Sequence, residues 1–144
     1  MRRRGNSTVG SNPTSSAIYM GFIMDTKLAK KLHSSICGLQ KFNKKYGKGV
    51  KEIEVSYIDI YKKYDDQNGK CYYTGFPLEA KYNYISYHPF AISVERLDNN
   101  LSYNSNNIVL TTRFANLARC SYGGDFFVII DEMKEHFINT DKKV

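Results

Sequence analysis

The chain has 144 residues and a formal net charge of +7, with 42% hydrophobic and 24% charged residues. This length suits one domain with a modest core. No apolar run approaches the ~20 residues of a membrane-spanning helix, and three widely separated cysteines cannot form a disulfide framework. The composition therefore argues against a membrane-spanning or disulfide-stapled protein and favours an intracellular, reducing compartment.

The positive charge is concentrated at the start of the chain. Residues 1–24 contain three arginines and no acidic residue, and they show no hydrophobic periodicity. This pattern predicts a disordered basic tail. Residues 25–144 are expected to form a single domain, whose smaller positive excess suits a polyanion such as double-stranded DNA. On charge alone, a basic protein that binds no nucleic acid remains an alternative interpretation.

The first predicted helix covers residues 25–46, where Asp25 or Thr26 can cap its N-terminus. Its apolar residues recur near helical spacing at Leu28, Leu32, Ile36 and Leu39. Lysines crowd the remaining positions. They can lie along a DNA backbone or form a solvated cationic face, and the sequence favours neither.

A second helix is predicted over residues 56–64. Its stripe of Tyr and Ile residues is more typical of a core face than of a base-stacking platform. Asn68-Gly69 predicts a turn into a hairpin around Cys71, which we expect to be held by packing of Tyr72, Tyr73, Phe76 and Leu78. Residues 79–90 form a connector without a clear period.

Residues 92–119 predict a strand, a turn, a strand and a helix. Residues 92–97 are apolar apart from Glu95-Arg96, and residues 98–107 are rich in the turn-forming Asn, Asp and Ser. Residues 108–112 are β-branched and apolar, as in a strand. A helix is predicted from residue 113, with Phe114, Leu117 and Ala118 on one side of it.

A final amphipathic helix is predicted over residues 124–137, with Asp125 near its start, where an acidic residue suits the helix dipole. Its apolar residues are expected to pack on the strand–strand–helix unit. The predicted fold class is therefore α+β.

Several segments share their order and spacing with a known pattern. In that pattern the first strand reads Ser-x-Asp-Arg-Ile-Asp, an Asn precedes the second strand, an Asn and a basic residue follow on the helix, and a Gly-x-Cys-x-x-(Cys or Thr)-Gly hairpin stands upstream. The matching residues here are Ser93-Val94-Glu95-Arg96-Leu97-Asp98, Ser102-Tyr103, Asn107-Ile108-Val109, Asn116, Arg119, Gly69-Lys70-Cys71-Tyr72-Tyr73-Thr74-Gly75 and, downstream, Gly124-Asp125-Phe126-Phe127.

Over about half its length the chain thus resembles the HNH endonuclease family, in the variant common in phage and large DNA viruses. The resemblance implies a ββα-metal core over about residues 70–120, with additional flanking helices. It implies a metal-dependent DNA endonuclease that hydrolyses phosphodiester bonds, either virus-encoded or homing-like.

The resemblance also assigns a cation site. Glu95 matches the family's metal-ligand Asp, and Asn116 matches the helix Asn that supplies a second oxygen. Such ligands suit one Mg²⁺ or Mn²⁺. A structural zinc is not expected, because Thr74 stands where zinc-binding relatives have a second Cys.

The other site residues follow from the same match. Arg96 stands where standard HNH enzymes have the catalytic His, and because a guanidinium cannot accept a proton it is expected to bind phosphate. Arg113 and Arg119 are expected to do the same. The general base stays open between His88, if its segment doubles back, and another group, while Asp98 can orient a water or support the turn. Asn107 is expected to brace the turn.

Two other interpretations stay open. Glu in place of Asp and the absent His both favour a catalytically degenerate HNH-fold protein that binds DNA without cutting it. A chance resemblance in a helical interaction protein is the third interpretation, and such a protein would show no β structure.

Overall fold

The computed structural model describes residues 23–122 and, beyond them, residues 125, 126, 128, 129, 131, 132 and 135. The predicted tail therefore lies outside the described residues except for its last two positions. Of these, Met24 is fully buried in the core, so the assignment of residue 24 to the tail was wrong. Much of the predicted final helix also lies outside the described part.

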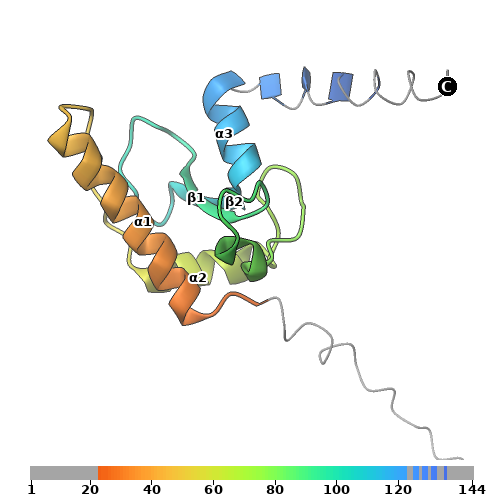
Figure 1. Ribbon diagram of the computed structural model, residues 1–144, viewed down its shortest axis with the longest axis horizontal. Coiled ribbons are helices and arrows are strands. Elements are labelled where there is room, and N and C mark those ends of the chain that lie inside the picture. The colour runs from red at the N-terminus through yellow and green to blue at the C-terminus, as the bar shows by residue number, and fades with distance from the viewer. Residues whose placement is uncertain (1–22, 123–124, 127, 130, 133–134, 136–144) are drawn as a thin grey trace, which may run out of the picture.

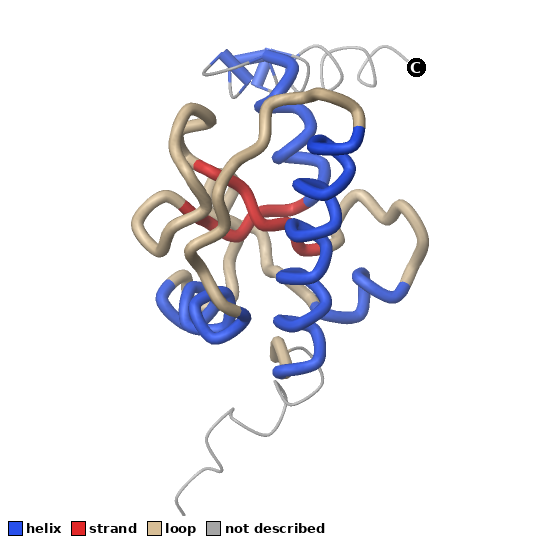
Figure 2. Tube along the Cα trace, turned by 90° about the vertical axis from the view of Figure 1, so that its left-hand side faces the viewer, coloured by secondary structure: helices blue, strands red, loops and turns tan. Residues whose placement is uncertain are grey.

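The described elements form a mixed α+β fold, as predicted. In chain order they are α1 (Thr26–Lys45), α2 (Tyr57–Asp66), the 3₁₀ helix η2 (Ala80–Tyr84), β1 (Ile92–Arg96), β2 (Ile108–Thr112) and α3 (Arg113–Tyr122). Figure 1 shows α3 on one side of the two strands and α2 on the other, with α1 alongside. In Figure 2 α1 runs vertically in front of the strands, drawn in red.

The helix starts are set by the side chains before them. Asp25 accepts a hydrogen bond from the Leu28 amide at 2.7 Å and caps α1. Ser56 and Asp59 form a reciprocal capping box at the start of α2. The Leu and Ile residues at helical spacing in α1 are buried, except the exposed Leu39, so both predicted helices are confirmed.

Among the described residues the sheet has two strands, and their outer edges are covered by amide side chains. β1 and β2 pair antiparallel, with Val94 opposite Leu110. The Gln67 carboxamide accepts from the Leu110 amide at 2.8 Å and donates to its carbonyl at 2.8 Å. Asn83 makes the same pair of bonds with Ile92, both at 2.9 Å. These contacts satisfy edge groups that would otherwise be open to another strand.

The hairpin before η2 is closed by the Cys71 amide, which donates to the Phe76 carbonyl at 2.7 Å. Cys71 and Leu78 are almost fully buried, whereas Tyr72 and Phe76 are about half exposed. The Tyr72 ring contacts Tyr73 edge-on at a centroid distance of 5.2 Å, and Phe76 stacks on Phe90 at 5.0 Å. The residues expected to pack the hairpin therefore all make contacts, with Leu78 in the core and Tyr72 and Phe76 at the surface.

Gly69 connects α2 to this hairpin, and we expect Gly69→Ala to destabilise the fold by about 2–3 kcal/mol. Its φ is +64°, and a Cβ here would lie 3.0 Å from the hydroxyl oxygen of the buried Tyr64. Gly47 has the same φ but nothing within 4 Å. Gly47→Ala is therefore the matched control. It should lower the free energy of unfolding by about 1 kcal/mol, the cost of placing a residue with a Cβ at positive φ. Equal losses for the two variants in urea denaturation would contradict the steric contribution.

Candidate functional site

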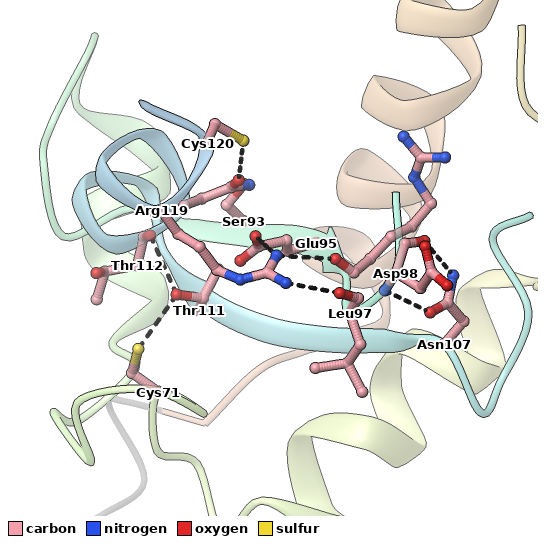
Figure 3. Close-up of polar contacts among 12 residues, drawn as sticks. Cys71, Ser93, Glu95, Leu97, Asp98, Asn107, Thr111, Thr112, Arg119 and Cys120 are labelled. Carbon is pink, nitrogen blue, oxygen red and sulfur yellow. Dashed lines mark hydrogen bonds and ion pairs between the residues drawn. The ribbon is translucent and has the colours of Figure 1, made fainter. Parts of the chain in front are cut away.

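Two pairs of side chains join β1 to α3. Ser93 and Glu95 are two residues apart on β1 and share one face of the strand, while Asn116 and Arg119 are three apart on α3 and also share a face. The Asn116 amide donates to the Ser93 hydroxyl at 2.8 Å, and Arg119 Nη1 donates to Glu95 Oε1 at 2.5 Å. Figure 3 shows the Arg119 side chain reaching across to Glu95. Strand and helix periodicities thus bring the four residues together.

The apolar side predicted for α3 is only partly covered. Phe114 and Leu117 are about half exposed, whereas Ala118 packs against the core. The helix buries Ala115, and its polar side chains Asn116 and Arg119 bond to β1.

Arg119 is held entirely by internal groups. Besides Glu95, its guanidinium donates to the backbone carbonyls of Arg96 at 3.2 Å and Leu97 at 2.6 Å. It also lies 5.3 Å from the centre of the Tyr73 ring. Arg119 therefore caps the end of β1 and neutralises Glu95.

Glu95 is the buried acid of this site, with only 4% of its surface exposed. Burial raises the pKa of its carboxyl above the ordinary value, and the Arg119 guanidinium opposes that rise. Burial, and then the charge of Glu95, raise the pKa of the Tyr73 phenol. Tyr73 therefore stays protonated beside the carboxylate. Among the described residues, Glu95 Oε2 accepts no hydrogen bond of normal geometry.

The donor atoms here fit a hard cation in their chemistry. Glu95 Oε2 accepts no hydrogen bond of normal geometry from the described residues, although the Tyr73 phenol acts on the same carboxyl and lowers its pKa. The Asn116 side-chain oxygen receives a 3.6 Å contact from the Cys120 thiol. Mg²⁺ often binds through one or two protein oxygens and several waters. The described residues contain no cluster of three His, Cys, Asp or Glu that could hold a metal, so a cation would depend on these oxygens and would compete with Arg119 for Glu95.

Glu95 and Asn116 line the same cavity, which has a volume of about 710 Å³. Its walls come from β1, α3, the middle of α1 and the connector after η2. Arg96, Arg113 and Cys120 line it as well. Cys120, one of the residues in this wall, is exposed. Glu95 and Asn116 therefore lie in the wall of one cavity.

The other two predicted phosphate ligands differ in how they are held. Arg96 donates to the carbonyls of Asn99 at 3.0 Å and Leu101 at 2.9 Å, so it supports the turn between the strands. Arg113 lies with its guanidinium 5.0 Å from the centre of the Tyr87 ring. A guanidinium that lies over a ring can still donate its N–H groups to another acceptor, whereas the Arg96 guanidinium already donates to two carbonyls. Arg113 is therefore better placed than Arg96 to bind phosphate.

The structure does not bring His88 to Glu95. Its Nδ1 accepts from the Phe90 amide at 3.1 Å, and its ring stacks on Tyr82 at a centroid distance of 4.2 Å. It is not among the residues that line the cavity. Asp98 is exposed and accepts from the Asn100 amide at 2.8 Å, which is the turn-supporting alternative among its two expected roles.

Asn107 makes the contacts of the expected brace. Its side-chain oxygen accepts from the Asp98 amide at 2.9 Å, and its amide group donates to the carbonyls of Asp98 at 3.0 Å and Ser102 at 2.8 Å. The residue is buried. The long turn is therefore closed around one side chain.

Sequence reasoning named Ser93 in the first-strand motif and Tyr73 in the hairpin, but it assigned neither residue to the site. Ser93 could have been found, because strand alternation places it on the same face as Glu95. Tyr73 carries no such signal, since it comes from a hairpin 22 residues away along the chain.

Comparisons with protein-family models, curated proteins and solved structures found no significant match to this chain. In the part of the chain that the structure describes, no helix combines the length and apolar character needed to cross a bilayer. A functional assignment consequently depends on the residues and their geometry.

Proposed function

We propose that this protein is an HNH-type, metal-dependent DNA endonuclease. The observation that carries the proposal is the convergence of Glu95 from β1 and Asn116 from α3 on one cavity. The order strand, strand, helix and the positions of both residues within it agree with the HNH resemblance. Arg113 on the same wall supplies a positive charge for the phosphate.

The residues of the site would have separate roles. Glu95 and Asn116 would hold one Mg²⁺ or Mn²⁺ through their side-chain oxygens, and Arg113 would hold the backbone in line. When bound, the cation would stabilise the charge that develops on the phosphate and the leaving oxygen. Arg119 would keep Glu95 ionised despite its burial.

A DNA-binding protein that does not cut is the second candidate. The Arg119–Glu95 ion pair favours it, because a guanidinium already neutralises the acid that would bind the cation. The placement of His88 away from the cavity also favours it, since no histidine of the described part of the chain lines the cavity beside Glu95.

Nicking of supercoiled plasmid with Mg²⁺, Mn²⁺ or EDTA distinguishes the two. We expect metal-dependent nicking by the full chain and a loss of at least about a hundredfold in Glu95→Gln and in Asn116→Ala, since each removes charge stabilisation worth several kcal/mol. Glu52→Gln is the matched control, because Glu52 is exposed and does not line the cavity. Salt-sensitive DNA binding without nicking under any metal would support the second candidate and overturn the first.

A further inference from the structure

Tyr87 stands in a conformation and position that the fold itself does not require. Its φ is +55°, and 80% of its surface is exposed. The His88 amide donates to the Ile85 carbonyl at 3.4 Å, which makes Tyr87 the third residue of a β-turn. Gly or Asn normally fills such a position when φ is positive. A strained aromatic residue held out in solvent indicates a role outside the core.

One neighbour is seen over the Tyr87 ring, the Arg113 guanidinium at 5.0 Å, and most of the ring's surface is exposed. Both residues line the cavity that contains Glu95 and Asn116. Lys31 lines the same cavity and donates a 2.7 Å hydrogen bond to the Asn83 carbonyl. An exposed aromatic ring and two cations are therefore part of the candidate site.

We propose that Tyr87 stacks on an unpaired base of DNA, with Arg113 and Lys31 binding the flanking phosphates. A base is flat and matches the exposed ring, and base–aromatic stacking tolerates any sequence. In a fully paired duplex the base faces are hidden, so the preferred substrate is DNA with a bulged, mismatched or extruded nucleotide beside the cleaved bond. The inference rests on the proposed function only in taking DNA as the partner.

The test measures binding alone. Fluorescence anisotropy of a short labelled duplex, with and without one bulged nucleotide, is recorded in EDTA so that no cutting occurs. We expect the full chain to prefer the bulged duplex by about tenfold, the effect of one base–aromatic stack. Tyr87→Gly should remove that preference and Tyr87→Phe should keep it. Gly suits the positive φ, so an unchanged or raised melting temperature of Tyr87→Gly would separate lost stacking from lost folding.

Tyr46→Ala is the matched control. Tyr46 is also exposed, at 57%, and lies under the ammonium of Lys45 at 5.3 Å, but it does not line the cavity. It should retain the preference for the bulge. Equal binding of both duplexes, or a preference that survives in Tyr87→Gly, would overturn the inference while leaving DNA binding and the nicking assay unaffected. Failure to bind either duplex would overturn it together with the proposed function.

Discussion

Replacing Arg119 by methionine is expected to lower the free energy of unfolding by about 3–5 kcal/mol at pH 8, the loss typical when one partner of a buried ion pair is removed. Glu95 is 4% exposed, and Arg119 supplies the one guanidinium bonded to it among the described residues. The same substitution removes the bonds to the Arg96 and Leu97 carbonyls. Methionine keeps much of the side-chain volume, so the loss reports on charge and hydrogen bonding.

The loss should depend on pH in a defined direction. Burial raises the pKa of Glu95 in the folded protein, so the folded state binds its proton more tightly than the unfolded state. For such a group, stability is greatest below the pKa of the unfolded chain and falls as pH rises through the folded pKa. Without Arg119 the folded pKa rises further. The destabilisation should therefore be smaller at pH 4 than at pH 8.

Urea denaturation of Arg119→Met and wild type at both pH values checks this expectation. Arg113→Met is the matched control, since Arg113 contacts an exposed ring and no carboxylate, and it should cost less than about 1 kcal/mol. The double variant Glu95→Gln, Arg119→Met should be more stable than Arg119→Met alone, because the buried charge is removed. A loss below 1 kcal/mol that does not change with pH would show that the pair is not buried in solution.

Asn107→Ala is expected to destabilise the protein by about 2–4 kcal/mol, because three backbone groups of the turn lose their partner. They are the amide and carbonyl of Asp98 and the carbonyl of Ser102. Asn107 is buried, and it precedes β2 directly. The loss should extend to the register of the two strands, since the turn sets how they meet.

Thermal or urea unfolding measures this effect, with Asn106→Ala as the matched control. Asn106 is the exposed neighbour in the same turn, and its replacement should change stability by no more than about 0.5 kcal/mol. Asn107→Asp would keep the acceptor but direct a carboxylate at two carbonyls, so it should be more harmful at pH 8 than at pH 4. Similar small losses for Asn106→Ala and Asn107→Ala would argue against the brace.

The Arg119–Glu95 ion pair also matters for the choice between the two proposed functions, a DNA endonuclease and a protein that only binds DNA. A guanidinium at 2.5 Å from Glu95 Oε1 occupies the side of the carboxylate that faces α3. A cation would have to use the other oxygen or displace Arg119 from it. The Arg119–Glu95 contact is therefore the feature by which a DNA-cutting enzyme and a protein that only binds DNA would differ.

The periodic parts of this protein could be predicted from its sequence. α1, α2, both strands and the start of α3 lie within one or two residues of their predicted positions, because apolar spacing and capping side chains act over a few neighbouring residues. Asn107 could be predicted for the same reason, since its partners lie within nine residues of it.

Other features depended on contacts between segments that are distant in sequence. Hydrophobicity predicted an apolar side of α3 at Phe114 and Leu117, but it gave no sign that α3 turns Asn116 and Arg119 toward β1. That orientation depends on Glu95, because a buried carboxylate is stable only with a partner. The exposed Tyr87 came from a connector without a period, where no local pattern predicts a backbone conformation. The elements were thus determined locally, whereas the ion pair, the cavity and the face of α3 were decided by tertiary packing, which alone brings residues more than twenty positions apart within hydrogen-bonding distance.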